Sequence, residues 1–187
     1  EVGEVESFPA PYSLSTLADT AGFSDVSAAA KAAGVAIDWD TAFMKALGEN
    51  YERYAAGVYR EGNLHGGTVQ SVSDAVAPTA FVRGETEWDD STALPWVPAE
   101  NLLTDERRSL PAETVHYPPP SNAVRPATTT GLGLGNTVTE ALLTGLYEVI
   151  ERDAAMLAWY STFEPLRVAV DDHAQYDTLR RRPTSEG

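Results

Sequence analysis

The sequence predicts an α+β fold in which two long amphipathic helices pack with a mainly antiparallel sheet. Apolar residues recur at three- and four-residue spacing near residues 41–60 and again near 137–160, which indicates two helices. Between them, short β-leaning pieces are separated by turn residues. The 187 residues, 43% of them hydrophobic, are enough for one domain with its own core. We therefore expect a single domain over residues 1–187.

The first third is predicted to contain one long helix. Residues 8–12 are broken by prolines and favour an extended strand end or edge. Residues 24–34 are rich in small side chains and leave a short helix and a flexible connection equally open. Asp40 is predicted as the N-cap of a helix over 41–60 that stops near Gly62. Its apolar positions are predicted to form one buried stripe: Phe43, Leu47, Tyr51, Tyr54 and Val58.

The middle third, residues 66–130, is predicted to consist of antiparallel strands and loops. Residues 79–83 and 94–98 favour strands, because they are β-leaning and bounded by turn residues. Residues 114–117 run into three consecutive prolines, which must be irregular or polyproline-like.

The last third is predicted to contain the second helix. Thr137 and Glu140 fit a capping box, and the helix is expected to continue to about Tyr160. Residues 167–170 then form a strand candidate. The helix has a wide apolar face: Leu142, Leu143, Leu146, Val149, Ile150 and Leu157.

Composition excludes several classes of function. Asp and Glu number 28 against 13 Lys and Arg, so the net charge of −15 disfavours binding to nucleic acid or to an anionic membrane. No apolar run approaches the roughly 20 residues of a membrane-spanning helix, and no signal peptide is evident. Without cysteines, the chain has no disulfide, thiolate zinc site or cysteine nucleophile.

The same composition suggests where the protein works. Many carboxylates with only two lysines are typical of a protein kept soluble in concentrated salt, where screening tolerates self-repulsion. We therefore expect a cytoplasmic protein of a halophile. The first residue is Glu1 and the last stretch is polar, so we also expect a piece of a longer chain, cut at both ends.

Both helices carry the pattern Glu-x-x-Glu-Arg, with Glu49 and Glu52 in the first and Glu148 and Glu151 in the second. Residues three apart are neighbours on one helix face, so each pair of carboxylates shares a face. On the second helix, Glu140 and Arg152 fall within the same arc of about 120°.

Two interpretations of these carboxylates remain open. They are either solvated faces with local Glu–Arg pairing, Glu140 serving the capping box, or they turn toward each other and line one cleft. Five carboxylates in a cleft require a cation, and without His or Cys the natural cation is Mg²⁺, which usually keeps water or phosphate in its shell. Arg152 would then contact a phosphate. The glycine run at 131–136 either lets the backbone approach a nucleotide or is a plain loop.

Several motifs resemble those of YcaO-domain proteins. TTGLGLGNT at 129–137, EA at 140–141 and GLYEVIERDA at 145–154 closely resemble the second nucleotide-binding motif of that family. KALGENYERY at 45–54 resembles the first motif, and WVPA at 96–99 is similar to a strand between the two. The resemblance runs from about Asp40 to Ala154 and implies a partial YcaO-like fold.

The resemblance implies an enzyme that depends on ATP and Mg²⁺ and phosphorylates peptide backbone amides, giving an azoline or a thioamide. It further implies a peptide or protein substrate. A docking protein or a sulfur-delivery protein is a candidate partner, and the chain itself could form an oligomer. The alternatives are an accessory subunit that binds Mg–ATP without amide chemistry, and an acidic docking or structural domain without a ligand. No catalytic residue is assigned.

The resemblance also implies roles for individual residues. Nucleotide contacts are assigned to Asn136, Glu148, Glu151 and Arg152, and metal ligation to Glu49, Glu52, Glu140, Glu148 and Glu151.

Overall fold

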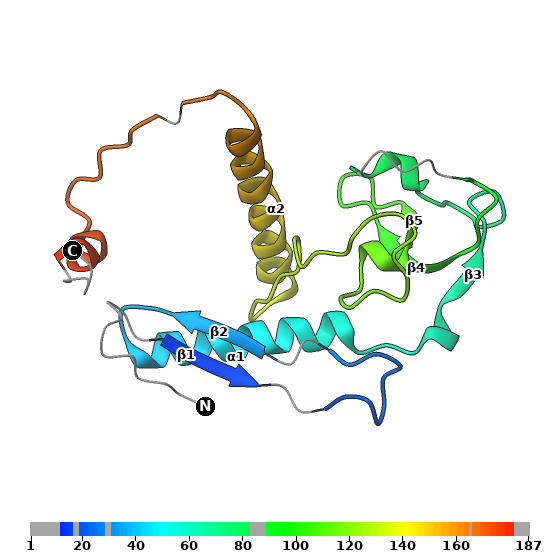
Figure 1. Cartoon of the computed structure of the whole chain (residues 1–187), viewed down its shortest axis with the longest axis horizontal. Coiled ribbons are helices and arrows are strands. Elements are labelled where there is room, and N and C mark those ends of the chain that lie inside the picture. Colours follow the sequence, from blue (N-terminus) through cyan, green and yellow to red (C-terminus); the bar gives the residue numbers. More distant parts are fainter. Residues whose placement is uncertain (1–11, 17–18, 29–30, 83–88, 165, 182–187) are drawn as a thin grey trace. The chain divides into compact units, whose positions relative to one another are not determined.

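The computed structural model describes residues 12–16, 19–28, 31–82, 89–164 and 166–181 (Figure 1). Its helices and antiparallel strands confirm the predicted fold class. The chain divides into two compact units: unit 1 comprises Glu1–Leu17, Ala30–Glu52 and Thr130–Gly187, and unit 2 comprises Ala18–Ala29 and Arg53–Thr129. Helix α1, Trp39–Gly57, supplies residues to both. The single domain expected over residues 1–187 stays a prediction.

In unit 1, strands β1 (Tyr12–Thr16) and β2 (Lys31–Val35) form an antiparallel hairpin. Residues 31–34 belong to a strand, so both alternatives considered for 24–34, a short helix and a flexible connection, are wrong there. Residues 8–11 lie outside the described residues. β2 packs closely on α1 at Gly34, where a Cβ would lie only 2.0 Å from the carbonyl oxygen of Ala42. Hairpin and helix therefore meet through their backbones.

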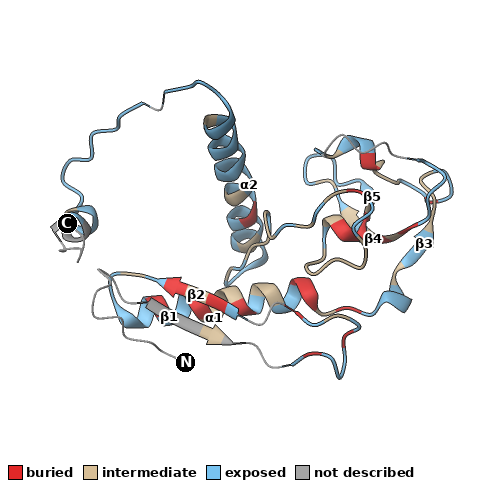
Figure 2. Cartoon of the chain, in the orientation of Figure 1, coloured by how far each residue is buried: buried red, intermediate tan, exposed pale blue. Residues whose placement is uncertain are grey.

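This close approach decides which face of α1 is buried. Ala42 and Ala46 are completely buried and Asn50 nearly so (Figure 2). The predicted stripe is wrong in this respect, because Phe43 and Tyr51 are 48% and 60% exposed. Only small side chains fit where Gly34 brings the two backbones together.

The N-terminus of α1 is capped by Asp38, so the prediction of Asp40 is wrong. The two oxygens of the Asp38 carboxylate accept hydrogen bonds from the backbone N–H of Thr41, at 2.9 Å, and from its hydroxyl, at 2.8 Å. These bonds, the backbone one foremost, lower the pKa of Asp38. Asp40 instead lies in the first turn, where a negative charge still favours the helix dipole.

α1 ends at Gly57 rather than near Arg60, because residues of unit 2 take its last carbonyls. The oxygen of Ala56 accepts the N–H of Tyr117 at 3.1 Å and contacts Nδ1 of His116 at 3.0 Å. The oxygen of Gly57 accepts the hydroxyl of Ser24 at 3.1 Å. A sequence pattern does not reveal such tertiary caps.

Helix α2, Val138–Tyr160, confirms the second predicted helix. Thr137 is its N-cap and accepts the N–H of Glu140 at 3.2 Å. Its apolar face is exposed, with Leu142 at 49% and Ile150 at 57% (Figure 2). No helix among the described residues is long and apolar enough to cross a membrane.

The predicted strand at 167–170 is wrong. The described backbone from Leu166 to Val170 pairs with no strand in the part of the chain that the structure describes. A short helix that the sequence did not predict, α3 (Ala174–Arg181), follows it.

Unit 2 contains a three-stranded antiparallel sheet in the order β3 (His65–Gly67), β4 (Leu94–Glu100) and β5 (Arg107–Pro111). β4 confirms the predicted strand at 94–98. The predicted strand at 79–83 is wrong over its described residues: 79–80 belong to a 3₁₀ helix, Pro78–Ala80, whose first position proline favours, and 81–82 belong to no strand. Residue 83 lies outside the described residues. Two further 3₁₀ turns are Glu61–Asn63 and Ala112–Thr114.

The core of unit 2 lies against β4. Trp96 is 2% exposed, and its indole N–H donates to the carbonyl of Gly67 on β3 at 2.8 Å. Four buried residues form one hydrophobic cluster: Val72, Leu94, Trp96 and Val124. The indole therefore contributes both apolar area and a hydrogen bond between strands.

A buried carboxylate organises the loop after β5. Glu113 is 1% exposed and accepts the N–H groups of Ala123, Val124 and Arg125 at 2.9, 2.6 and 3.1 Å. It also accepts the hydroxyl of Ser121. These four donors satisfy the buried charge and fix the shape of residues 121–125.

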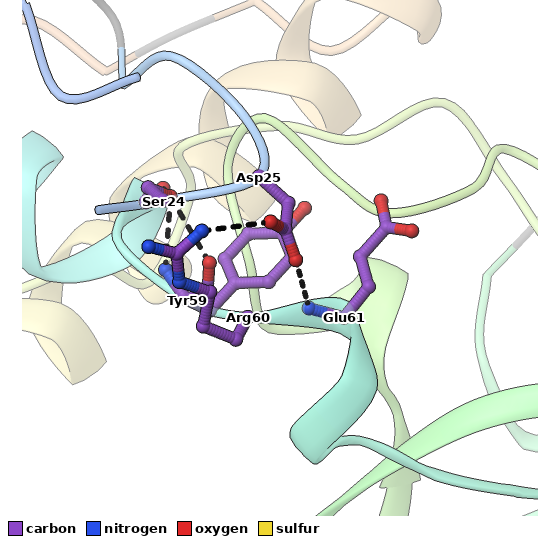
Figure 3. Close-up of polar contacts among 6 residues, drawn as sticks. Ser24, Asp25, Tyr59, Arg60 and Glu61 are labelled. Atoms are coloured by element: carbon purple, nitrogen blue, oxygen red, sulfur yellow. Dashed lines mark hydrogen bonds and ion pairs between the residues drawn. The ribbon is translucent and has the colours of Figure 1, made fainter. Parts of the chain in front are cut away.

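A second polar cluster ties residues 24–25 to the chain just after α1 (Figure 3). Asp25 accepts the N–H of Glu61 at 2.8 Å and the guanidinium of Arg60 at 3.0 Å, and these two contacts, in that order, lower its pKa. The hydroxyl of Tyr59 donates to the carbonyl of Pro118 at 2.9 Å. Burial, with the negative charges of Glu61 and Asp25, raises the pKa of Tyr59 to about 12.

Candidate metal and nucleotide site

The carboxylates of α1 lie beside the hairpin of unit 1. Glu49 and Glu52 are three residues apart and both are half-buried. Oε2 of Glu49 accepts the backbone N–H of Ala33 on β2 at 2.8 Å. The strand thereby orients this side chain, a contact that the sequence pattern did not predict.

The carboxylates of α2 are oriented by the segment that precedes the helix. Oε2 of Glu140 accepts the backbone N–H of Asn136 at 2.8 Å and contacts its side-chain amide at 3.3 Å. Oε2 of Glu148 accepts the N–H of Gly131 at 2.9 Å. In both side chains these hydrogen bonds involve one carboxylate oxygen, so the other remains available to a ligand.

The glycine run places those backbone donors. Gly131 has φ of +91°, a conformation that favours glycine. A Cβ on Gly133 would lie 2.2 Å from the backbone oxygen of Ala141, and a Cβ on Gly135 would lie 2.5 Å from the backbone nitrogen of Ala141. The missing side chains of Gly133 and Gly135 therefore let the segment lie directly against α2, which favours the plain-loop interpretation.

Three of the five predicted metal ligands share one cavity of about 530 Å³ within unit 1. Glu49 and Glu52 contribute from α1, and Glu140 contributes from the first turn of α2. Asn136, predicted to contact the nucleotide, also lines the cavity. The remaining lining residues are Thr41, Met44, Lys45, Gly48, Leu134 and Thr144.

The other predicted site residues do not line this cavity. Glu148 is held to Gly131, while Glu151 and Arg152 are exposed on α2. Among the described residues neither Glu151 nor Arg152 forms an ion pair, so the local Glu–Arg pairing considered from the sequence does not occur at these two residues.

The donor set fits Mg²⁺ bound together with a phosphate. In the described part of the chain, no three acidic or histidine side chains already converge as a metal site. Mg²⁺ is usually held by one or two carboxylates plus waters and substrate phosphates, so a preformed cage of three is not required. Glu49, Glu52 and Glu140 supply oxygen donors around a cavity open enough to admit the phosphates.

The chain is similar to known proteins in sequence and in fold. A sequence model of the YcaO cyclodehydratase family, described as ATP- and Mg²⁺-binding, matches residues 33–187. The chain belongs to the YcaO family. The match includes both helices and every predicted site residue.

Solved structures of this family share the YcaO fold of the chain. The YcaO protein from Methanopyrus kandleri, bound with AMPPCP and Mg²⁺, superposes with a TM-score of 0.72 at 26% identity, over 97% of this chain and 46% of that one. A heterocyclase in complex with substrate and cofactor, at 24% identity, covers 80% of this chain and 24% of that one with a TM-score of 0.65, which supports the fold alone.

An uncharacterized protein from Methanothermobacter thermautotrophicus is 35% identical over 126 residues, which are 65% of this chain and 31% of the relative. The chain thus spans less than half the length of these two relatives. The predicted cofactors, ATP and Mg²⁺, are confirmed by the description of the matched family and by the ligands of the M. kandleri protein.

Proposed function

We propose that this chain binds Mg–ATP and contributes to activation of peptide backbone amides, leading to an azoline or a thioamide. The observation that carries the proposal is the cavity that Glu49, Glu52 and Glu140 line together with Asn136. Bound Mg–ATP would supply a phosphoryl group to the amide oxygen and turn it into a leaving group. A neighbouring Cys, Ser or Thr side chain, or a sulfide source, would then attack the amide carbon.

The carboxylates and the arginine have distinct roles in this proposal. Glu49, Glu52 and Glu140 hold the metal, and their charge is compensated by it. Glu148 and Glu151 contribute to the metal and the nucleotide, and Arg152 contacts a phosphate as a delocalised cation. The exposure of Glu151 and Arg152 supports this proposal, since both side chains are accessible to a ligand.

The substrate and partners are proposed for the whole protein. The substrate is a peptide or protein, and a docking or sulfur-delivery protein is a candidate partner. An accessory role, in which Mg–ATP is bound but amide chemistry occurs elsewhere, is the second candidate.

Calorimetric titration with Mg–ATP tests the site. Glu148→Gln and Glu151→Gln each remove a negative charge without changing shape, and we expect each to weaken Mg–ATP binding at least tenfold, about 1.4 kcal/mol. Glu100→Gln, an exposed carboxylate on β4, is the matched control and should bind like the wild type. Unchanged affinity in both site variants would contradict the assignment, and an absence of Mg–ATP binding in the wild type would favour the acidic docking domain.

Nucleotide hydrolysis separates the two candidate roles. ATP hydrolysis stimulated by a candidate peptide, measured as released phosphate, supports the enzyme. Tight Mg–ATP binding in the wild type with no peptide-stimulated hydrolysis supports the accessory role. Normal peptide-stimulated hydrolysis by Glu148→Gln would contradict the role proposed for Glu148.

A further inference from the structure

Unit 2 has a cavity of its own, of about 530 Å³, next to the edge strand β3. Its lining comes from β3, from the start of β4 and from the loop at 120–121, and all of these residues belong to unit 2. We call it the β3 cavity. No residue assigned to Mg²⁺ or to the nucleotide lines it, so the site in unit 1 does not account for it.

The lining of the β3 cavity is largely apolar and is held in place by the core of unit 2. Pro95 and Pro120 contribute apolar rings. Leu94, which is 3% exposed, belongs to the hydrophobic cluster around Trp96. Ser121 donates its hydroxyl to the buried carboxylate of Glu113. A lining held from behind in this way is preorganised, so little ordering is required when a ligand binds.

Gly66 gives β3 an outer edge that can form hydrogen bonds. It lies opposite Pro95 in the register of β3 and β4. Facing residues of an antiparallel pair either exchange two hydrogen bonds or direct their N–H and C=O groups away from each other. Proline has no N–H, so Gly66 and Pro95 form a pair of the second kind. The polar groups of Gly66 therefore point to the outer edge of β3, where they have no partner among the described residues.

The same glycine leaves room beside the strand. Gly66 is exposed, and a Cβ on it would meet nothing within 4 Å. An unpaired strand edge can accept a further extended chain, which gains main-chain hydrogen bonds from the strand and specificity from adjoining pockets. Because β3 has only three residues, main-chain pairing alone is weak and the β3 cavity must contribute to the affinity.

Glu61 supplies the charge of the β3 cavity. It is the charged residue of the lining, it is exposed, and it forms no ion pair with another described residue. In Figure 3 only its backbone N–H is joined to the cluster around Asp25. A free carboxylate beside an apolar lining complements a lysine or arginine side chain and disfavours an anionic ligand.

We propose that β3 and the β3 cavity dock an extended segment of the peptide substrate that carries a lysine or arginine. The main chain of the segment pairs with Gly66, its apolar side chains pack on Pro95 and Pro120, and its basic side chain reaches Glu61. Side chains two residues apart in an extended chain lie on one face, so the basic and apolar side chains alternate with others. This inference rests on the proposed function, and it adds where the substrate is held and which side chains it needs.

Fluorescence anisotropy with labelled peptides, on the whole chain and without Mg–ATP, tests the charge. One probe is a nonapeptide of alternating valine and serine with lysine at its centre, in place of a valine, and a second probe has glutamine there. The wild type should bind the lysine probe about three- to fivefold more tightly, as for an exposed ion pair. Glu61→Gln should abolish that preference, while Glu100→Gln, an exposed carboxylate of β4, should keep it.

A proline at the edge of β3 tests the main-chain pairing. Gly66→Pro removes the outward N–H without removing a hydrogen bond to β4, and it should weaken both probes about fivefold. Gly66→Ala keeps the N–H and has room for its Cβ, so it should bind within about twofold of the wild type. Thermal unfolding checks that both variants fold.

Modified peptides test the same pairing without any substitution in the protein. The lysine probe is N-methylated on alternate amides in two versions, and each version blocks one of its two edges. Because only one edge faces β3, one version should lose at least fivefold in affinity and the other should bind like the parent probe.

Four results would overturn the proposal. Three are a lysine probe that does not bind the wild type, an unchanged preference in Glu61→Gln, and equal binding of the two N-methylated versions. The fourth is a wild-type dimer that becomes monomeric in Gly66→Pro, measured by sedimentation velocity, since the edge would then pair with a second copy. No nucleotide is present in these measurements, so a failure of Mg–ATP binding would contradict the proposed function and leave the docking site standing.

Discussion

The two units of this YcaO chain use carboxylates in opposite ways. In unit 2, Glu113 is buried and all of its hydrogen bonds go to four donors of one loop. In unit 1, Glu140 and Glu148 are each held by N–H donors on a single oxygen. The first arrangement satisfies the charge within the protein, while the second orients the charge and leaves capacity for a ligand.

This difference separates a carboxylate whose charge is satisfied within the protein from carboxylates that keep an oxygen available for the proposed ligand. The number of hydrogen-bond donors distinguishes the two kinds of carboxylate. Four donors compensate a buried charge, whereas one backbone donor compensates it only in part. Unit 2 also has the described cluster of large buried side chains around Trp96, whereas the buried positions of unit 1 include Ala32, Ala42 and Ala46. We therefore expect substitutions of buried residues in unit 2 to act on stability and those at the cavity of unit 1 to act on Mg–ATP binding.

The largest expected effect on stability is that of Glu113→Ala. It leaves three N–H groups and the Ser121 hydroxyl without their acceptor, which should lower the free energy of unfolding by about 3–5 kcal/mol. Urea unfolding followed by circular dichroism measures it. Glu100→Ala, an exposed carboxylate of the same unit, should change it by less than about 0.5 kcal/mol. A loss below about 1 kcal/mol in Glu113→Ala would remove the contrast between the two units.

A smaller effect, on both stability and binding, is expected for Gly133→Ala. The new Cβ would meet the carbonyl of Ala141 at 2.2 Å and push residues 131–136 away from α2. We expect a loss of about 1–3 kcal/mol in stability. Because the same segment holds Glu140 and Glu148, Mg–ATP binding should also weaken.

The matched control is Gly62→Ala in unit 2, where a Cβ would meet nothing within 4 Å. It should leave the free energy of unfolding within about 0.5 kcal/mol of the wild type. If Gly133→Ala destabilises the chain but binds Mg–ATP like the wild type, the glycine run does not position the carboxylates of the site.

Local signals in the sequence predicted much of unit 1 and of its site. The second helix was predictable because its cap, Thr137 with Glu140, lies in adjacent residues. The buried face of α1 was not, because it depends on Gly34, a residue on a strand whose packing no periodicity reveals. The N-cap was missed for a different, local reason, because two aspartates stand near the start of α1 and only the contact of Asp38 with Thr41 decides between them.

The sequence predicted which carboxylates belong to the candidate site but not their geometry, and their role in binding stays a prediction. Glu49, Glu52 and Glu140 followed from helical spacing and line one cavity. The donors that orient them could not be predicted from spacing, because Ala33 and Gly131 contribute only backbone N–H groups. Any residue type carries such a group, so the sequence holds no signal for it.

The smallest expected effect is on the pH dependence of the free energy of unfolding, and it concerns the exposed contacts of Asp25 in unit 2. The pKa of Asp25 is lowered by the N–H of Glu61 and by Arg60, so the folded state holds its proton less tightly than the unfolded state does. The resulting stabilisation is present above the ordinary carboxyl pKa of about 4 and is lost as pH falls through the lower, folded value. The difference in unfolding free energy between the wild type and Asp25→Asn should therefore be constant near neutral pH and shrink below about pH 4.

Asp90→Asn, which also removes one exposed negative charge from unit 2, is the control for the general acid destabilisation of a chain with 28 acidic residues. Urea unfolding at a series of pH values from neutral to acidic measures both differences. A difference for Asp25→Asn that follows the Asp90→Asn curve at every pH would show that the contacts with Arg60 and Glu61 add nothing to stability. The stability of unit 2 would then depend on buried groups such as Glu113 and Trp96, because solvent-exposed ion pairs are screened and cost side-chain entropy.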